Sequence, residues 1–113
     1  MARIHVRPTG AALGAEVTGV DLSKPLNADT VAAIRSAWLD HLVLAFPDQP
    51  MGHDDLERFT RYFGDFGEDP FIAPLPERPH LIEVKRGAEE KASVFAAAWH
   101  SDWSFQDTPP AAT

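Results

Sequence analysis

The alternation of apolar and polar positions predicts three strands in the first half of the chain. Residues 4–7 alternate, and after a turn at residues 8–10 a second alternating run covers residues 15–20. We expect these two runs to form a hairpin. Residues 42–46 are continuously apolar and are followed by Pro47, which is typical of a buried central strand leading into a turn.

Two stretches have the period of an α-helix. The first covers residues 28–42, and its apolar stripe consists of Val31, Ile34, Trp38 and Leu42. Asn27 stands directly before this stretch and is a good N-cap, so we expect a helix here that covers the sheet. The second helix is expected from Asp54 to Phe63, where Gly64 supplies the stop.

The second half of the chain is less regular. Residues 64–79 contain two glycines and four prolines, which predicts loops. A short strand is expected at residues 81–84, followed by a solvated charged turn at residues 85–91. The aromatic run at residues 99–105 is expected to form a further strand.

The composition narrows the class of protein. The chain has 113 residues, 44% of them hydrophobic, which suits one globular domain with a core. A net charge of −7 argues against a nucleic-acid partner, and the absence of cysteine excludes disulfides and thiolate chemistry. No apolar run suits a signal peptide or a membrane span, so we expect a cytoplasmic protein with no membrane partner. Residues 108–113 resemble a turn and the start of another strand, so we expect the chain to be truncated.

His100 and Asp102 are the candidate catalytic residues and metal ligands. On a strand, residues two apart face the same side, so their side chains would converge. Such a pair is two thirds of the 2-His-1-carboxylate triad that holds non-haem Fe(II). The third ligand, a distant His, is not in this chain. Random placement gives roughly 0.4 His-x-Asp pairs in such a chain, so a His–Asp hydrogen bond on a solvent face remains the alternative.

A second pair with this spacing, His53 and Asp55, lies at the start of the second expected helix. On a helix, residues two apart point in different directions, so this pair is not expected to share a metal. Asp54 or Asp55 is instead expected to cap the helix.

Several segments carry a resemblance to a known family. They are Gly14-Ala15-Glu16-Val17-Thr18-Gly19-Val20-Asp21-Leu22, His41-Leu42-Val43-Leu44-Ala45-Phe46-Pro47-Asp48-Gln49, Phe63-Gly64-Asp65, Trp99-His100-Ser101-Asp102, Phe105 and Thr108-Pro109-Pro110-Ala111. Over almost all 113 residues, the chain resembles the N-terminal part of the Fe(II)- and 2-oxoglutarate-dependent taurine dioxygenase family (TauD/TfdA-like), which includes the 2,4-dichlorophenoxyacetate dioxygenases.

The resemblance implies a fold and a reaction. The expected fold is mixed α/β and β-rich, a partial double-stranded β-helix (jelly roll) with two flanking helices. Residues 1–113 would form the N-terminal part of this domain. His100 and Asp102 would be iron ligands, and a second His and an oxoglutarate-binding Arg would lie beyond Thr113. The implied enzyme uses Fe(II), 2-oxoglutarate and O2 to oxidise a small-molecule substrate, with decarboxylation of 2-oxoglutarate to succinate.

The resemblance also points to substrate-binding positions. In taurine-specific members a His, a Tyr and an Asn bind the substrate, and the matching positions here are Asp69, Ile72 and Ala96. Asp69 would repel a sulfonate, so taurine itself is not the expected substrate. If Asp69 faces the pocket, it would favour a cationic or hydroxyl-bearing group. An apolar substrate body would be favoured by Phe71, Ile72, Trp103 and Phe105.

Alternative roles stay open for several of these residues. Asp69 could be a solvated loop residue, and Trp99 and Phe105 are expected in the core. In the family, the region equivalent to residues 85–98 can act as a lid. A chain of this length is expected to bind iron weakly and not to turn over. The alternative function is a non-catalytic jelly-roll binding or assembly module, and residues 28–42 could also pack in a homo-oligomer.

Overall fold

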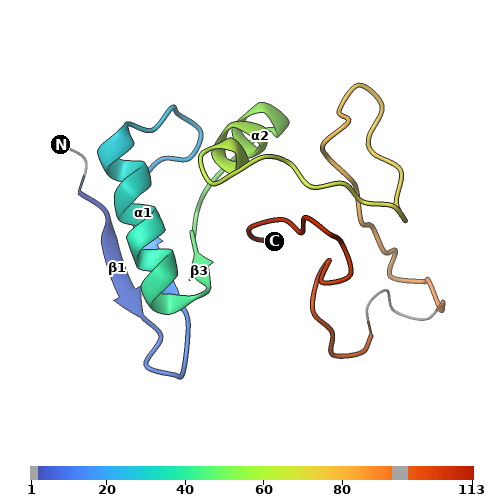
Figure 1. Ribbon diagram of the computed structural model, residues 1–113, viewed down its shortest axis with the longest axis horizontal. Helices are drawn as coiled ribbons and strands as arrows, with labels where there is room; N and C mark the ends of the chain where they lie inside the picture. The colour runs from blue at the N-terminus through green and yellow to red at the C-terminus, as the bar shows by residue number, and fades with distance from the viewer. Residues whose placement is uncertain (1–2, 93–96) are drawn as a thin grey trace. The chain divides into compact units, whose positions relative to one another are not determined.

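The computed structural model describes residues 3–92 and 97–113 (Figure 1). The chain divides into two compact units, Met1–Phe63 and Gly64–Thr113. Every strand and helix of the described residues lies in the first unit. The proposed metal ligands lie in the second.

A three-stranded sheet forms the base of the first unit. Strands β1 (His5–Pro8) and β2 (Ala15–Thr18) pair antiparallel, as the alternating pattern predicts, and β3 (Leu44–Ala45) pairs parallel to β2. The order β1-β2-β3 places β3 at an edge, so the prediction of a buried central strand at 42–46 is wrong. Leu42 is the C-cap of the preceding helix with φ of 69°, and only Leu44 and Ala45 of the predicted run pair with β2.

Helix α1 (Ala28–His41) lies over the sheet, as predicted (Figure 1). The Asn27 side chain accepts a hydrogen bond from the Thr30 N–H at 2.8 Å, so Asn27 is the expected N-cap. The helix buries Ile34 and Ala37, and the sheet buries Val17 and Ala15. These side chains form the core of the first unit.

Helix α2 (His53–Arg61) begins one residue before the predicted start at Asp54 and ends two residues before the predicted end at Phe63. Phe59 on α2 packs edge to face against Phe46 and Phe63, with ring centroids 5.5 and 5.2 Å apart. The Phe63 ring in turn meets Trp38 of α1 at 6.2 Å. The regularly spaced apolar side chains of this segment therefore pack as predicted, although no residue of α2 is fully buried.

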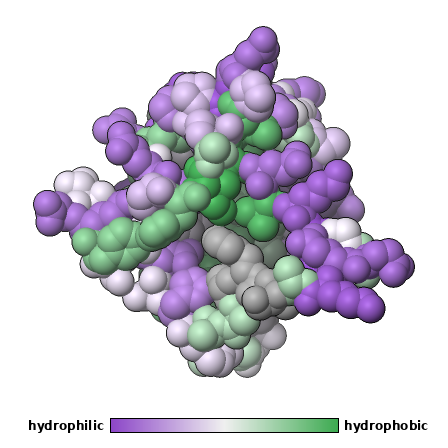
Figure 2. All heavy atoms as spheres, turned by 90° about the vertical axis from the view of Figure 1, so that its right-hand side faces the viewer, coloured by the Kyte–Doolittle hydropathy of each residue, from purple (hydrophilic) through white to green (hydrophobic). Residues whose placement is uncertain are grey.

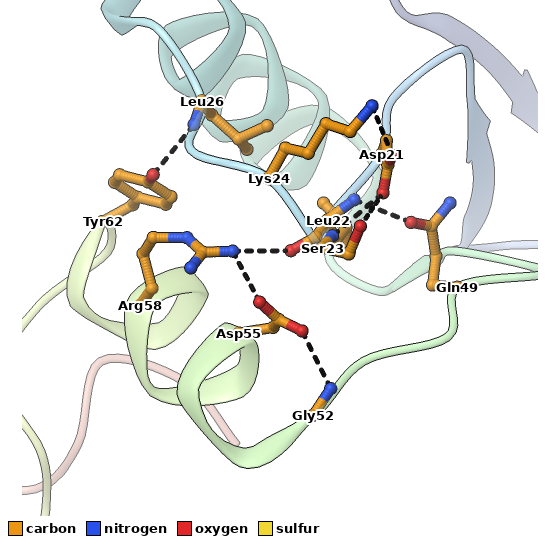
Figure 3. Close-up of polar contacts among 10 residues, drawn as sticks. All are labelled: Asp21, Leu22, Ser23, Lys24, Leu26, Gln49, Gly52, Asp55, Arg58 and Tyr62. Atoms are coloured by element: carbon orange, nitrogen blue, oxygen red, sulfur yellow. Dashed lines mark hydrogen bonds and ion pairs between the residues drawn. The ribbon is translucent and has the colours of Figure 1, made fainter.

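Polar contacts join the loop that follows β2 to more distant segments (Figure 3). The Gln49 amide accepts from the Leu22 N–H at 2.8 Å and donates to the Val20 carbonyl at 3.0 Å. The Tyr62 hydroxyl accepts from the Leu26 N–H at 2.9 Å. Backbone groups that no sheet or helix satisfies thus find side-chain partners.

The second unit has no regular helix or strand among its described residues. The strand predicted at residues 81–84 is absent, and the nearest pairing is an isolated bridge between Leu75 and Arg78. More described residues lie in helices than in strands, so the expectation of a β-rich chain is not met. Sheet pairing needs a second strand, and the local pattern of residues 81–84 does not supply one.

Large apolar side chains are exposed in both units, among them Leu39 at 64% and Phe71 at 73%. Figure 2 shows apolar surface between hydrophilic side chains on one face of the molecule. None of the helices in the described part of the chain has the length and apolar character needed to cross a bilayer.

Candidate functional site

His100 and Asp102 meet in a loop of the second unit. The Nε2 atom of His100 lies 2.9 Å from Oδ1 of Asp102, and about half of each side chain is exposed. Residues 97–107 run through bends and turns, so the strand predicted at 99–105 is wrong. The two side chains converge all the same, because a bend can also bring residues two apart onto one side.

A backbone carbonyl fixes the orientation of the His100 ring. The Nδ1 atom lies 2.7 Å from the Ala98 carbonyl oxygen, which can only accept, so Nδ1 carries a proton. In the neutral ring this leaves the Nε2 lone pair facing the Asp102 carboxylate. Metal-binding histidines commonly donate their other N–H to a carbonyl in this way, so the pair fits a divalent metal ion.

The same contacts raise the pKa of His100 above its ordinary value. The largest cause is the hydrogen bond to the Ala98 carbonyl, and the Asp102 charge and hydrogen bond add to it, while partial desolvation opposes it. A metal ion would therefore compete with a proton for Nε2. Without a metal, the pair is a charge-assisted hydrogen bond, which is the alternative left open by the sequence.

Within residues 3–92 and 97–113, no three His, Cys, Asp or Glu side chains gather as a metal site. His53, the other candidate considered, is the first residue of α2. The Asp55 carboxylate accepts from the Gly52 N–H at 2.9 Å and pairs with Arg58 at 2.8 Å. Asp55 therefore accepts a hydrogen bond from a backbone N–H at the N-terminus of α2 and caps the helix, as predicted.

Asp69, the first candidate substrate residue, is half-buried and bonded to its own loop. Its Oδ1 accepts from the Phe71 N–H at 2.7 Å and from the Ile72 N–H at 3.1 Å. This carboxylate therefore shapes the turn that carries Phe71. Ile72 is half-buried, and Ala96 lies outside the described residues.

Three aromatic side chains meet in this unit: Phe71, Trp103 and Phe105, hereafter the aromatic cluster. Their ring centroids lie 6.0 to 6.4 Å apart. Phe105 is 65% exposed and Trp99 is 104% exposed, so the expectation that both lie in the core is wrong for the described structure.

Two features of the site have no signal in the side-chain pattern. One is the Ala98 carbonyl, because a backbone acceptor has no residue type that reveals it. The other is the backbone of Trp103, whose φ of 57° is uncommon for a bulky residue. The charged segment 85–91 is an exposed turn, as expected, and Arg86 closes it by donating to the Glu90 and Ala92 carbonyls.

Comparison with family models decides the family. The model described as "Taurine catabolism dioxygenase TauD, TfdA family" matches residues 5–113. The chain belongs to this family.

Curated relatives match nearly the whole chain. A (S)-phenoxypropionate/alpha-ketoglutarate-dioxygenase from Delftia acidovorans is 44% identical, over 90% of this chain and 37% of the relative. An alpha-ketoglutarate-dependent sulfate ester dioxygenase from Pseudomonas putida is 29% identical, over 97% of this chain and 36% of the relative. The chain thus spans about a third of the length of the curated relatives it matches.

Solved structures share the fold over much of the chain. A taurine dioxygenase from Burkholderia xenovorans is 36% identical with a TM-score of 0.61, covering 67% of this chain and 28% of that one. The structure of AAD-2 in complex with Mn(II) and N-oxalylglycine is 29% identical with a TM-score of 0.56, covering 57% of this chain and 24% of that one. The mixed α/β arrangement of a small sheet and two helices is therefore a taurine dioxygenase-like fold.

Proposed function

We propose that this protein is an Fe(II)- and 2-oxoglutarate-dependent dioxygenase that oxidises a small organic substrate. The reaction would convert 2-oxoglutarate, O2 and a substrate C–H bond into succinate, CO2 and an alcohol. The observation that carries the proposal is the His100 Nε2 atom facing the Asp102 carboxylate at 2.9 Å, in a chain of the TauD/TfdA family.

His100 and Asp102 would hold Fe(II) through Nε2 and a carboxylate oxygen. When bound, the iron and 2-oxoglutarate would supply the activation of O2 that amino-acid side chains cannot perform. The related structure with Mn(II) and N-oxalylglycine supports the proposal that a divalent metal ion and 2-oxoglutarate bind here. N-oxalylglycine differs from 2-oxoglutarate only by an NH in place of one methylene. Within this chain, the Ala98 carbonyl would keep the His100 ring in the tautomer that offers Nε2 to the metal.

The substrate is proposed to be a small organic molecule other than taurine. The relatives include enzymes named for phenoxypropionate and for sulfate esters, so the family does not fix the substrate class. Asp69 lies at a position proposed to meet the substrate, and a carboxylate there would repel a sulfonate. Near Asp69, Phe71 offers a largely exposed ring to an apolar group.

We further propose that the β1-β2-β3 sheet and the second unit belong to a jelly roll, which is supported by the likeness to the taurine dioxygenase structure. Residues 1–113 would be the N-terminal part of that domain. A cytoplasmic location, a homo-oligomer and a lid at residues 85–98 stay predictions.

The test compares His100→Ala and Asp102→Ala with the parent sequence, each in the full-length protein that contains residues 1–113. Both variants should lose Fe(II) binding and at least about a thousandfold in substrate-dependent succinate formation, which corresponds to roughly 4 kcal/mol of barrier. Mn(II) binding followed by electron paramagnetic resonance gives a readout that does not depend on turnover. Asp107→Ala is the matched control, since it removes an exposed carboxylate from the same unit.

A non-catalytic binding or assembly module is the second candidate. The charge-assisted contact between His100 and Asp102 favours it, because this pair is satisfied without a metal. Full-length parent protein that binds a partner but forms no succinate with any substrate, and whose partner binding survives His100→Ala, would support the module and contradict the enzyme.

A further inference from the structure

Two segments of the second unit contact each other beside the loop of the candidate metal ligands. They are residues 64–68 and 106–111, hereafter the clamp. The Gln106 side chain donates from Nε2 to the Glu68 carbonyl at 3.0 Å, although the two residues are 38 positions apart. The Pro110 ring lies against the backbone of the other segment. Gln106 and Pro110 are half-buried, whereas the three residues between them are exposed.

The contact of Pro110 depends on the absence of a side chain at Gly67. A Cβ atom there would lie 2.7 Å from Cγ of Pro110, which is closer than side chains pack. The φ of Gly67 lies outside the left-handed region that favours glycine. The close approach of the proline ring, rather than the backbone turn, therefore requires glycine at this position. Since a proline ring is rigid, it cannot swing aside as a long side chain would.

Gln106 joins the clamp to the turn that carries a metal ligand. Its backbone N–H donates to the Trp103 carbonyl at 3.0 Å, and Trp103 directly follows Asp102. The hydroxyls of Ser101 and Ser104 lie 3.0 Å apart and close the same turn. Gln106 thus holds the turn through its backbone and the opposite segment of the clamp through its side chain.

The turn needs such support because its backbone is strained. Trp103 has φ of 57°, in the left-handed region that a bulky side chain disfavours. A residue stays in a conformation of this kind only when the surrounding contacts hold it there. The bond from the Gln106 N–H is one such contact. Loosening Gln106 would therefore allow the backbone next to Asp102 to relax.

We propose that the clamp positions His100 and Asp102 for the metal ion, with Gln106 and Gly67 as positioning residues. This inference rests on the proposed dioxygenase function and assigns a role to residues outside the set of metal ligands. Both ligand side chains are about half exposed, so burial does not fix them and the loop backbone has to. Replacing groups that orient metal ligands commonly weakens metal binding by about 10- to 100-fold.

The first experiment measures Mn(II) affinity in the full-length protein that contains residues 1–113. Mn(II) is the probe, because the electron paramagnetic resonance signal of the free ion reports the unbound fraction. Gln106→Met keeps the length of the side chain but removes the donor, and it should weaken binding about tenfold. Thr108→Val is the matched control, since it changes an exposed polar side chain in the same segment, and it should leave the affinity unchanged.

A second variant tests the other contact of the clamp. Gly67→Ala places a methyl group against the Pro110 ring and should also weaken Mn(II) binding about tenfold. When Pro110→Ala is added, the nearest atom of residue 110 is its Cβ at 3.5 Å, so the double variant should bind as tightly as Pro110→Ala alone. Gly87→Ala is the control, because a Cβ there meets nothing within 4 Å.

Hydrogen exchange separates positioning from a general loss of structure. In the metal-free protein, the amides of residues 99–105 should exchange faster in Gln106→Met and Gly67→Ala than in the parent. The amides of the first unit should exchange at the parental rate, because the clamp lies wholly within the second unit. Faster exchange throughout both units would show a general loss of structure and would overturn the positioning role.

The metal titrations distinguish this inference from the proposed function. If the parent binds Mn(II) and His100→Ala does not, an unchanged affinity in Gln106→Met or in Gly67→Ala keeps the dioxygenase and overturns the clamp. A parent protein that binds no Mn(II) contradicts the dioxygenase, and the positioning role falls with it.

Discussion

The two units of the chain differ in what holds their residues in place. In the first unit, Val17 and Ile34 are fully buried, and Gln49 bonds to backbone groups 27 and 29 residues away. In the second unit, no described residue is fully buried, and the hydrogen bonds mainly close local turns, as Asp69 does for Phe71. The first unit therefore has its own core, whereas the second depends on loop geometry.

This difference matters because the proposed metal ligands and the aromatic cluster all lie in the second unit. Loops commonly carry binding and catalytic groups, while packed elements provide stability. Substitutions in the first unit should thus change the free energy of unfolding, and those in the second unit should change binding. Far-UV circular dichroism reports the first unit selectively, since both α1 and α2 lie there.

The largest expected effect on the free energy of unfolding is found by replacing one isoleucine with alanine in each unit. Ile34→Ala should lower the free energy of unfolding by about 2–5 kcal/mol, because it removes a fully buried side chain and leaves a cavity. Ile82→Ala should change it by less than about 0.5 kcal/mol, because Ile82 is 39% exposed in the second unit. Urea denaturation measures both variants when it is followed at 222 nm for the first unit and by tryptophan fluorescence, to which Trp99 and Trp103 contribute, for the second.

Leu39→Ala is the matched control for Ile34→Ala. It removes a side chain of the same size from the same helix, but Leu39 is 64% exposed. Its effect should stay within about 0.5 kcal/mol. Similar losses in Ile34→Ala and Ile82→Ala would show that the units do not differ in the way the burial indicates.

A second prediction compares two glutamines that bond to the backbone. Gln49→Ala should lower the free energy of unfolding by about 1–3 kcal/mol, because it leaves the partly buried Leu22 N–H without its acceptor. Gln106→Ala removes one exposed bond to the Glu68 carbonyl and should change it by less than about 0.5 kcal/mol. Equal losses in the two variants would contradict the distinction between the units.

The sequence predicts the first unit well, because its elements follow local patterns. The hairpin of β1 and β2 follows alternation, and α1 follows its apolar stripe and the Asn27 cap. The strands expected at residues 81–84 and 99–105 fail, because an aromatic or β-branched run forms a strand only beside a partner strand. Local pattern carries no information about that partner.

The candidate site likewise has one contact that the sequence predicts and one that it does not. The spacing of His100 and Asp102 reveals that the two side chains can meet, although the strand expected to bring them together is absent. The meeting of Phe71 with Trp103 joins residues 32 positions apart, which spacing cannot reveal. Contacts between distant loops depend on the whole fold, so only the structure provides them.

The third prediction tests how much the N-cap of α1 contributes to the stability of the first unit. Asn27→Ala should lower the free energy of unfolding by about 1 kcal/mol, because the Thr30 N–H at the start of α1 loses its acceptor. Asn27→Ser should retain most of the stability, because Ser caps helices nearly as well. The same denaturation experiment measures both variants, and equal losses in the two would show that the cap bond contributes little.

The smallest expected effect is a dependence on pH at the start of α2. The Gly52 N–H and then Arg58 hold the pKa of Asp55 below its usual range. A carboxyl whose pKa is lower in the folded state stabilises that state above its unfolded pKa of about 3.9. This stabilisation is lost as the pH falls through the lower folded value.

Asp55→Asn isolates this contribution, because the amide keeps the shape of the side chain and loses the charge. The difference in thermal midpoint between the parent and Asp55→Asn should be constant from pH 7 to about 5 and should shrink below about pH 4. The first unit would then weaken in acid through one identified carboxylate.

Asp21 also has a lowered pKa, mainly through its hydrogen bond from the Ser23 hydroxyl. It is present in both proteins, so most of its effect on the difference in thermal midpoint cancels. A difference that persists unchanged to pH 3 would show that the contacts of Asp55 with Gly52 and Arg58 do not favour its charged form.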